Sequence, residues 1–125
     1  LYTDPYQKLA AYKSELFRAI RLVTDVGLHT GIMTREESIQ YMMEKGGREK
    51  NASVSETERY MAQPGQALSY KTGELKITEL KNKYIKSLGP KFEIKKFHDA
   101  ILQVGSVPLS VFETYMDNWA NEQIK

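Results

Sequence analysis

The stretch Leu16-Phe-Arg-Ala-Ile-Arg-Leu-Val-Thr-Asp-Val-Gly-Leu-His29 combines an apolar helix with a line of charge. Its apolar residues cover most of the helical circumference, which is typical of a buried helix. The polar residues follow at intervals of three, four and four, and therefore share one face: Arg18, Arg21, Asp25 and His29. Because buried charge is costly without a partner, this polar stripe indicates either an internal ion-pair network or the wall of a binding site.

A second polar face follows Pro64-Gly65, a dipeptide that we expect to open another helix. At about 3.6 residues per turn, one side of this helix carries an amide, a hydroxyl, a phenol and a residue without a side chain. These residues are Gln66, Ser69, Tyr70 and Gly73. A helix that only packed against a core would place Leu or Ala there, so the pattern indicates a face that a ligand can approach.

Caps and breakers predict the boundaries of the remaining helices. Asp4-Pro5 is typical of the start of a helix, which we expect to run to about Leu28. Thr34-Arg-Glu-Glu37 and Ser53-Val-Ser-Glu56 both have the spacing of a capping box, and residues 46–52 between them are expected to form an exposed loop.

Three further helices are expected from Gly65 to Leu88, over residues 94–104, and after the cap Ser106. No segment has the alternating pattern of a strand. The sequence therefore predicts an all-α fold of about six helices in a bundle or helical layer, as a single domain over residues 1–125.

The composition limits the classes of partner. The 18 basic and 16 acidic residues are interspersed and give a net charge of +2, which argues against nucleic acid as a partner. No apolar run approaches the ~20 residues of a membrane span. The chain has no cysteine and two histidines, His29 and His98, whereas a catalytic zinc usually has three protein ligands. We therefore expect no cofactor to be bound by this chain alone.

Each polar face has a functional and a structural interpretation. Arg18 or Arg21 can bind a carboxylate, and His29 can donate to an oxyanion or move protons near neutral pH. The structural alternative is that Asp25 pairs with Arg21 while His29 closes a helix end. Both interpretations stay open at this point.

The second face has the same two interpretations. Tyr70 can donate its hydroxyl to an oxyanion, and Lys71 can bind a substrate carboxylate. Alternatively, Tyr70 is a packed tyrosine and Lys71 points to water. The aromatic group Phe112, Tyr115, Met116 and Trp119 is expected to be core or interface packing.

Four blocks, Arg21–His29, Arg59–Lys76, Phe97–Leu102 and Val107–Val111, together resemble the C-terminal part of the bacterial domain of unknown function 885 family. Members of this family resemble gluzincin-type zinc metallopeptidases, which are helical proteins of several hundred residues. Their His-Glu-x-x-His helix and a later glutamate ligand lie upstream of the region present here. The resemblance implies a C-terminal fragment that begins just after the last zinc ligand, with Leu1-Tyr2 ending the segment that carries it.

The resemblance also implies roles for the two polar faces. As catalytic residues, His29 and Tyr70 would hold a tetrahedral oxyanion. The substrate-binding residues would be Arg21, Gln66 and Lys71. Asp25 would orient Arg21 or His29, and the remaining supporting residues would be Arg18 and Ser69.

Two functions follow from these expectations. In the first, the chain forms the substrate and oxyanion wall of a zinc-dependent peptidase-like hydrolase, inactive alone. Its partners would be the upstream N-terminal portion of the same protein, which holds the zinc, and a peptide or small-molecule substrate. A bacterial, exported or periplasmic location would fit this hydrolase. In the second, the chain is a non-enzymatic helical module that binds a partner through the Gln66/Tyr70 face or the Phe112–Trp119 helix. A parent that kept the fold and lost catalysis is a third possibility.

Overall fold

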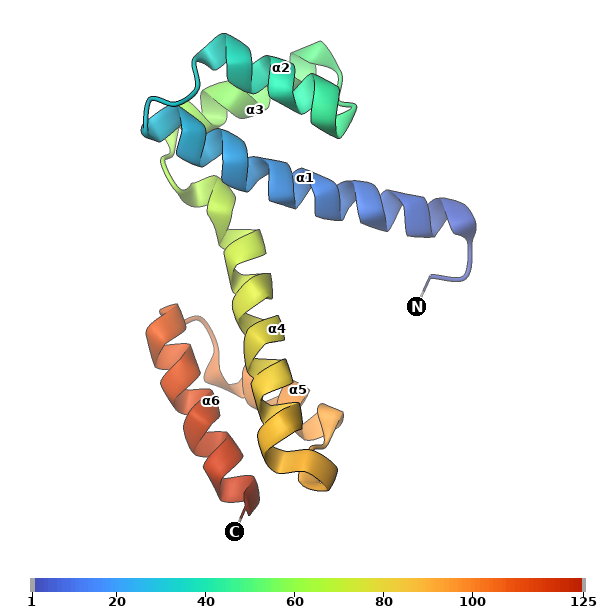
Figure 1. The fold of residues 1–125 in the computed structure, drawn as a ribbon, viewed down its shortest axis with the longest axis vertical. Helices are drawn as coiled ribbons and strands as arrows, with labels where there is room; N and C mark the ends of the chain where they lie inside the picture. Colours follow the sequence, from blue (N-terminus) through green and yellow to red (C-terminus); the bar gives the residue numbers. More distant parts are fainter. Residues whose placement is uncertain (1, 125) are drawn as a thin grey trace. The chain divides into compact units, whose positions relative to one another are not determined.

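The computed structural model describes residues 2–124, which form six α-helices and two short 3-10 turns (Figure 1). The helices are α1 (Pro5–His29), α2 (Arg35–Gly46), α3 (Lys50–Ala62), α4 (Ser69–Leu88), α5 (Ile94–Val104) and α6 (Leu109–Ile124). The turns are η1 (Gln66–Leu68) and η2 (Gly89–Lys91). No strand occurs over this range, so the predicted all-α fold is confirmed. Leu1-Tyr2 is predicted to end the segment that carries the last zinc ligand, and Leu1 lies outside the described residues.

Two of the predicted helix starts are confirmed by their hydrogen bonds. The Asp4 carboxylate accepts from the Tyr6 amide at 2.7 Å, one residue after the proline that begins α1. At the start of α2, the Thr34 hydroxyl accepts from the Glu37 amide at 3.2 Å. The Glu37 carboxylate in turn accepts from the Thr34 amide at 2.7 Å, which completes the capping box.

The capping box predicted at Ser53 is wrong, because α3 begins three residues earlier at Lys50. Ser53 therefore lies inside the helix, where its hydroxyl donates to the Glu49 carbonyl oxygen at 3.0 Å. Glu56 binds Arg59 and Tyr60 instead of a cap. The exposed loop expected over residues 46–52 is correspondingly shorter.

The start of the helix expected at Gly65 is also corrected. Gly65 has a left-handed backbone with φ of 79°, and η1 follows before α4 begins at Ser69. Glycine adopts this conformation without the steric penalty that a side chain would impose. The segment after Pro64 is thus a tight turn, and Gln66 lies in this turn rather than in the helix.

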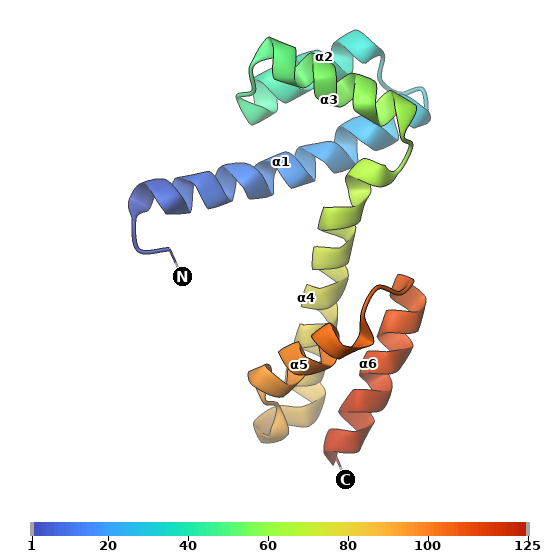
Figure 2. The same ribbon diagram turned by 180° about the vertical axis from the view of Figure 1, so that it is seen from behind.

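The described chain divides into two compact units, one up to Thr72 and one from Gly73. The division shows that each unit has more contacts within itself than with the other. The single domain expected over residues 1–125 stays a prediction. In the first unit, α2 and α3 cover the C-terminal half of α1, while its N-terminal half extends beyond them (Figure 2). Its buried apolar residues are Ile20, Met42, Tyr60 and Ala67. Between α2 and α3, the buried hydroxyls of Ser38 and Thr57 lie 3.1 Å apart and share a hydrogen bond.

The second unit has its own core, contributed by α4, α5 and α6. The buried residues are Leu80, Tyr84, Leu88, Phe97, Ala100, Phe112, Met116 and Ala120. Phe97 meets the rings of Tyr84 and Trp119 edge-to-face, with centroids 6.3 and 6.0 Å apart. Phe112 and Met116 are buried and Trp119 packs on this core, so the expectation that these residues form packing is confirmed.

Candidate functional site

Arg21, on α1, is a buried cation surrounded by aromatic rings. Only 4% of its surface is exposed, and its guanidinium carbon lies 5.6 to 5.7 Å from the ring centroids of Phe17, Tyr60 and Tyr70. One terminal nitrogen donates to the Gln66 side-chain oxygen at 3.5 Å. The buried Nε has no hydrogen-bond partner among residues 2–124. The positive charge therefore lies among three aromatic rings and is also attracted by the Glu56 carboxylate, while one donor is left without an acceptor.

A second arginine reaches the same amide oxygen. Arg59 donates to Gln66 Oε1 at 2.6 Å and to Glu56 Oε2 at 2.7 Å. The hydroxyl of the fully buried Tyr60 also donates to Glu56, at 2.6 Å. Since Gln66 accepts from two guanidinium groups, its oxygen is occupied within the protein, and its amide NH₂ is the group left to contact a ligand.

Glu56 and Arg59 are not among the site residues predicted from the sequence. Their spacing in the sequence could have identified them, because side chains three and four residues apart on a helix are neighbours. Glu56 contacts Arg59 and Tyr60 in this way. Burial alone would raise the pKa of Glu56, but hydrogen bonds from Arg59 and Tyr60 outweigh burial and lower the pKa below its usual value. Burial, followed by the bond to Glu56, raises the pKa of the Tyr60 hydroxyl.

Asp25 makes a contact that differs from the Arg21 pairing considered from the sequence. Its Oδ1 accepts from the Gly65 backbone amide at 3.0 Å, and its Oδ2 is buried without a partner among the described residues. Asp25 is only 2% exposed. This charge-assisted hydrogen bond holds the turn at Gly65 against α1.

Arg18 and Tyr70 form the open part of the site. The guanidinium carbon of Arg18 lies 4.7 Å from the centroid of the Tyr70 ring and 5.5 Å from that of Phe17. Tyr70 is 62% exposed. Within residues 2–124, neither the Arg18 guanidinium nor the Tyr70 hydroxyl has a hydrogen-bond partner. Stacking thus holds the cation in place, while its N–H donors have no acceptor within the described part of the chain and can bind a ligand.

His29 lies at the other end of the polar stripe, where α1 ends. Its Nε2 is 3.0 Å from the Tyr60 carbonyl oxygen, near the C-terminus of α3, and must donate there because a carbonyl only accepts. This contact matches the structural alternative in which His29 closes a helix end. At about 1.5 Å per residue, Arg18 and His29 are roughly 16 Å apart along the axis. The structure thus brings Tyr70 to Arg18 and Arg21 rather than to His29, and a joint oxyanion role for His29 and Tyr70 stays a prediction.

Lys71 and Ser69 make contacts within the protein. Lys71 is mostly buried and forms an ion pair with Glu15 of α1. The Ser69 hydroxyl donates to the Gln66 carbonyl oxygen at 2.9 Å, which supports the η1 turn. Lys71 therefore already binds a carboxylate of its own chain, and its role toward a substrate stays a prediction.

No group of three His, Asp or Glu residues in the described range is arranged to hold a metal ion. Between residues 2 and 124, no helix has both the length and the hydropathy needed to cross a bilayer.

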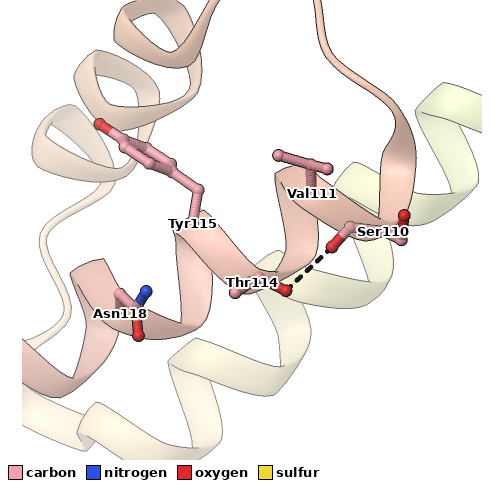
Figure 3. Close-up of a pocket in the computed structure, with 5 residues that line it drawn as sticks. All are labelled: Ser110, Val111, Thr114, Tyr115 and Asn118. Atoms are coloured by element: carbon pink, nitrogen blue, oxygen red, sulfur yellow. Dashed lines mark hydrogen bonds between the residues drawn. The ribbon is translucent and has the colours of Figure 1, made fainter.

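A hollow of about 430 Å³ lies in the second unit, on one face of α6 (Figure 3). It is lined by Ser110, Val111, Thr114, Tyr115 and Asn118. All five come from a single helix, and the Thr114 hydroxyl donates to the Ser110 carbonyl oxygen at 3.0 Å. The hollow carries no formal charge and includes Tyr115 of the predicted Phe112–Trp119 helix, but none of the predicted catalytic or substrate-binding residues. The arginine–tyrosine face of the first unit is therefore the better candidate site.

Comparisons with known proteins agree with this helical fold. The family model described as "Bacterial protein of unknown function (DUF885)" matches residues 1–116. A solved structure, described as "the putative lipoprotein from Colwellia psychrerythraea", has 46% sequence identity and a TM-score of 0.92 over 95% of this chain. The match covers 20% of that protein, so this chain spans about one fifth of its length. No curated protein matches the chain. The chain belongs to the DUF885 family of bacterial proteins.

Proposed function

We propose that the face formed by Arg18, Arg21 and Tyr70 binds a substrate carboxylate, as one wall of the cleft of a zinc-dependent peptidase-like hydrolase. The zinc would be held by residues of a longer protein that lie outside this chain. The substrate would be a peptide or a small molecule with a free carboxyl group. An exported location fits this proposal, because the solved relative is described as a lipoprotein.

The proposal rests on guanidinium donors of both arginines that have no acceptor among residues 2–124. Arg18 lies over the exposed Tyr70 ring without an acceptor among the described residues, and the Nε of Arg21 is buried without one. A carboxylate accepts bidentately from a guanidinium, and such charge-assisted bonds are among the stronger hydrogen bonds in proteins. Stacking on tyrosine preorganises the Arg18 guanidinium, which lowers the entropy cost of binding.

Two neighbouring groups would contact the rest of the substrate. The Tyr70 hydroxyl would donate to an oxyanion that develops during hydrolysis. The Gln66 amide NH₂ would donate to a substrate carbonyl, since two arginines already occupy the Gln66 oxygen. In this proposal Asp25 acts indirectly, by holding the Gly65 turn that places Gln66 and Tyr70 beside α1.

Carboxylate binding can be tested on the 125-residue chain. N-acetyl-Ala-Ala should shift backbone amide signals of the first unit in NMR titrations, whereas its C-terminal amide should bind more weakly. Arg18→Ala should weaken binding of the acid about tenfold or more, as expected when a charge-assisted bond is lost.

Arg35→Ala is the matched control, because Arg35 is an arginine of the same unit whose charge pairs with Glu36 and Glu58. The control should bind the acid normally. Equal binding of the acid and the amide, or equal loss in both variants, would show that this face is not a carboxylate site.

The hydrolytic part of the proposal needs a longer family protein that contains these residues. In such a protein with zinc bound, Tyr70→Phe should lower kcat about 100-fold with little change in KM, as for other oxyanion donors. The ring stays in place over Arg18, so binding of the acid should be retained. An unchanged kcat would exclude the oxyanion role, and binding without any cleavage would favour the non-enzymatic binding module.

A further inference from the structure

A line of exposed apolar side chains runs along α1, on the side away from the polar stripe. The α1 stripe consists of Leu9, Tyr12, Leu16, Val23 and Val26, which follow at intervals of three, four, seven and three residues. Their exposed fractions range from 44% to 72%. From Leu9 to Val26 the stripe is about 26 Å long.

The position of the α1 stripe on the helix shows that the first unit does not use it. The core side of α1 carries Ile20, Thr24 and Gly27, which are buried in the first unit. Those two helices lie over the C-terminal half of α1, and the half that carries Leu9 and Tyr12 extends beyond them (Figures 1 and 2). Single exposed apolar residues are ordinary, but a contiguous apolar line of this length is typical of a contact surface.

We propose that the α1 stripe packs against the part of a longer family protein that lies outside the matched segment. This inference rests on the longer protein of the proposed function. Almost the whole of this chain, 95%, matches the Colwellia relative, and that relative is about five times as long as the matched segment. Four fifths of that relative lie outside the match and can supply the covering surface.

The chemistry of the covering surface follows from the flanks of the α1 stripe. Lys8 and Lys13 lie on either side of it, and neither ammonium group has an ion-pair partner within the described range. Beside the stripe, Tyr2, Lys8, Ala11 and Tyr12 line a hollow of about 350 Å³, large enough to receive a side chain. The covering surface is therefore apolar at its centre, with carboxylates at its rim facing the two lysines.

The test compares one double substitution in two settings. Tyr12→Asp with Leu16→Asp is made in the 125-residue chain and in a chimera in which this chain replaces the matching fifth of the Colwellia protein. In the isolated chain the Tm should change by no more than about 1 °C, as for other surface substitutions. In the chimera the Tm should fall by roughly 3 °C or more, because two carboxylates would be buried in an apolar contact.

Tyr12→Phe with Leu16→Met is the matched control, which keeps the apolar contact and should leave both Tm values unchanged. The proposal would be overturned if the two aspartates lowered the Tm of the isolated chain and of the chimera equally, or left the Tm of the chimera unchanged. So would an isolated chain that sediments as a dimer and becomes monomeric with the aspartates, because the occupant would then be a second copy.

The relative's crystal structure gives a second test that does not depend on a folded chimera. After superposition, atoms of its other four fifths should lie in van der Waals contact with the counterparts of Tyr12 and Leu16. Open solvent at those positions would overturn the proposal. Neither substitution touches Arg18, Arg21 or Tyr70, so N-acetyl-Ala-Ala binding should persist, and failure of the carboxylate site is distinguishable from failure of this contact.

Discussion

Phe97→Ala should lower the free energy of unfolding of the second unit by about 3–5 kcal/mol, the usual cost of removing a large buried aromatic side chain. Phe97 is fully buried and contacts the rings of Tyr84, Phe92 and Trp119. The substitution removes these ring contacts and leaves a cavity that the neighbouring rings can fill only in part. Urea unfolding followed by fluorescence is the measurement, because Trp119 is the only tryptophan and lies in this core.

Leu102→Ala, on the same helix, is the control for Phe97→Ala. Leu102 is 80% exposed, so its truncation should change the free energy of unfolding by less than about 0.5 kcal/mol. A similar loss for both substitutions would mean that α5 packs through a different face from the one described.

Tyr60→Ala should lower the free energy of unfolding of the first unit by about 3–5 kcal/mol. Tyr60 is fully buried, its ring lies under the Arg21 and Arg59 guanidinium groups, and its hydroxyl binds Glu56. Tyr60→Phe keeps the ring and should cost only about 2 kcal/mol, the value of one hydrogen bond to a charged group. Native-state hydrogen exchange of amides in α2 and α3 measures both effects. Equal costs would contradict the packing role of the ring.

The same cluster predicts a dependence of stability on pH. Burial would raise the pKa of Glu56, but hydrogen bonds from Arg59 and Tyr60 outweigh burial and lower this pKa below its usual value in the folded chain. The unfolded chain therefore binds a proton first as the pH falls. The contribution of the Glu56 carboxylate is therefore fully present above about pH 5 and is lost as the pH falls through the folded pKa. The difference in stability between the wild type and Glu56→Gln should shrink below that pH. A constant difference would mean that the carboxylate is not ionised in this cluster.

The helix starts show what local sequence can and cannot predict. Thr34 and Ser53 both precede a glutamate by three residues, yet only Thr34 is a cap. Before Thr34, Gly31 ends the previous turn, whereas Glu49 allows α3 to begin before Ser53. The spacing of a Ser or Thr and a Glu identifies a possible capping box. Whether the Ser or Thr is the cap or lies inside the helix depends on whether the residues before it are already helical.

The candidate site shows a similar limit. The polar stripe of α1 follows from helical periodicity, and Arg21 and Asp25 are buried as the apolar surroundings indicated. Their partners could not be predicted, because they come from segments about 40 residues away, Gln66 for Arg21 and the Gly65 amide for Asp25. Periodicity places residues on a face, while tertiary packing decides which groups meet there.

The hydrogen bond from the Gly65 amide to Asp25 means that exchange of this one backbone N–H measures how often the turn at Gly65 separates from α1. Gly65 lies between α3 and η1, so no helix protects its amide, and its acceptor is a side chain on α1. Amides inside a helix are protected from exchange by carbonyl oxygens four residues away. The Gly65 amide is protected only while the turn stays in contact with Asp25, which lies 40 residues earlier in the chain. Its deuterium uptake therefore follows separation of α1 from the turn, without contributions from helix fraying.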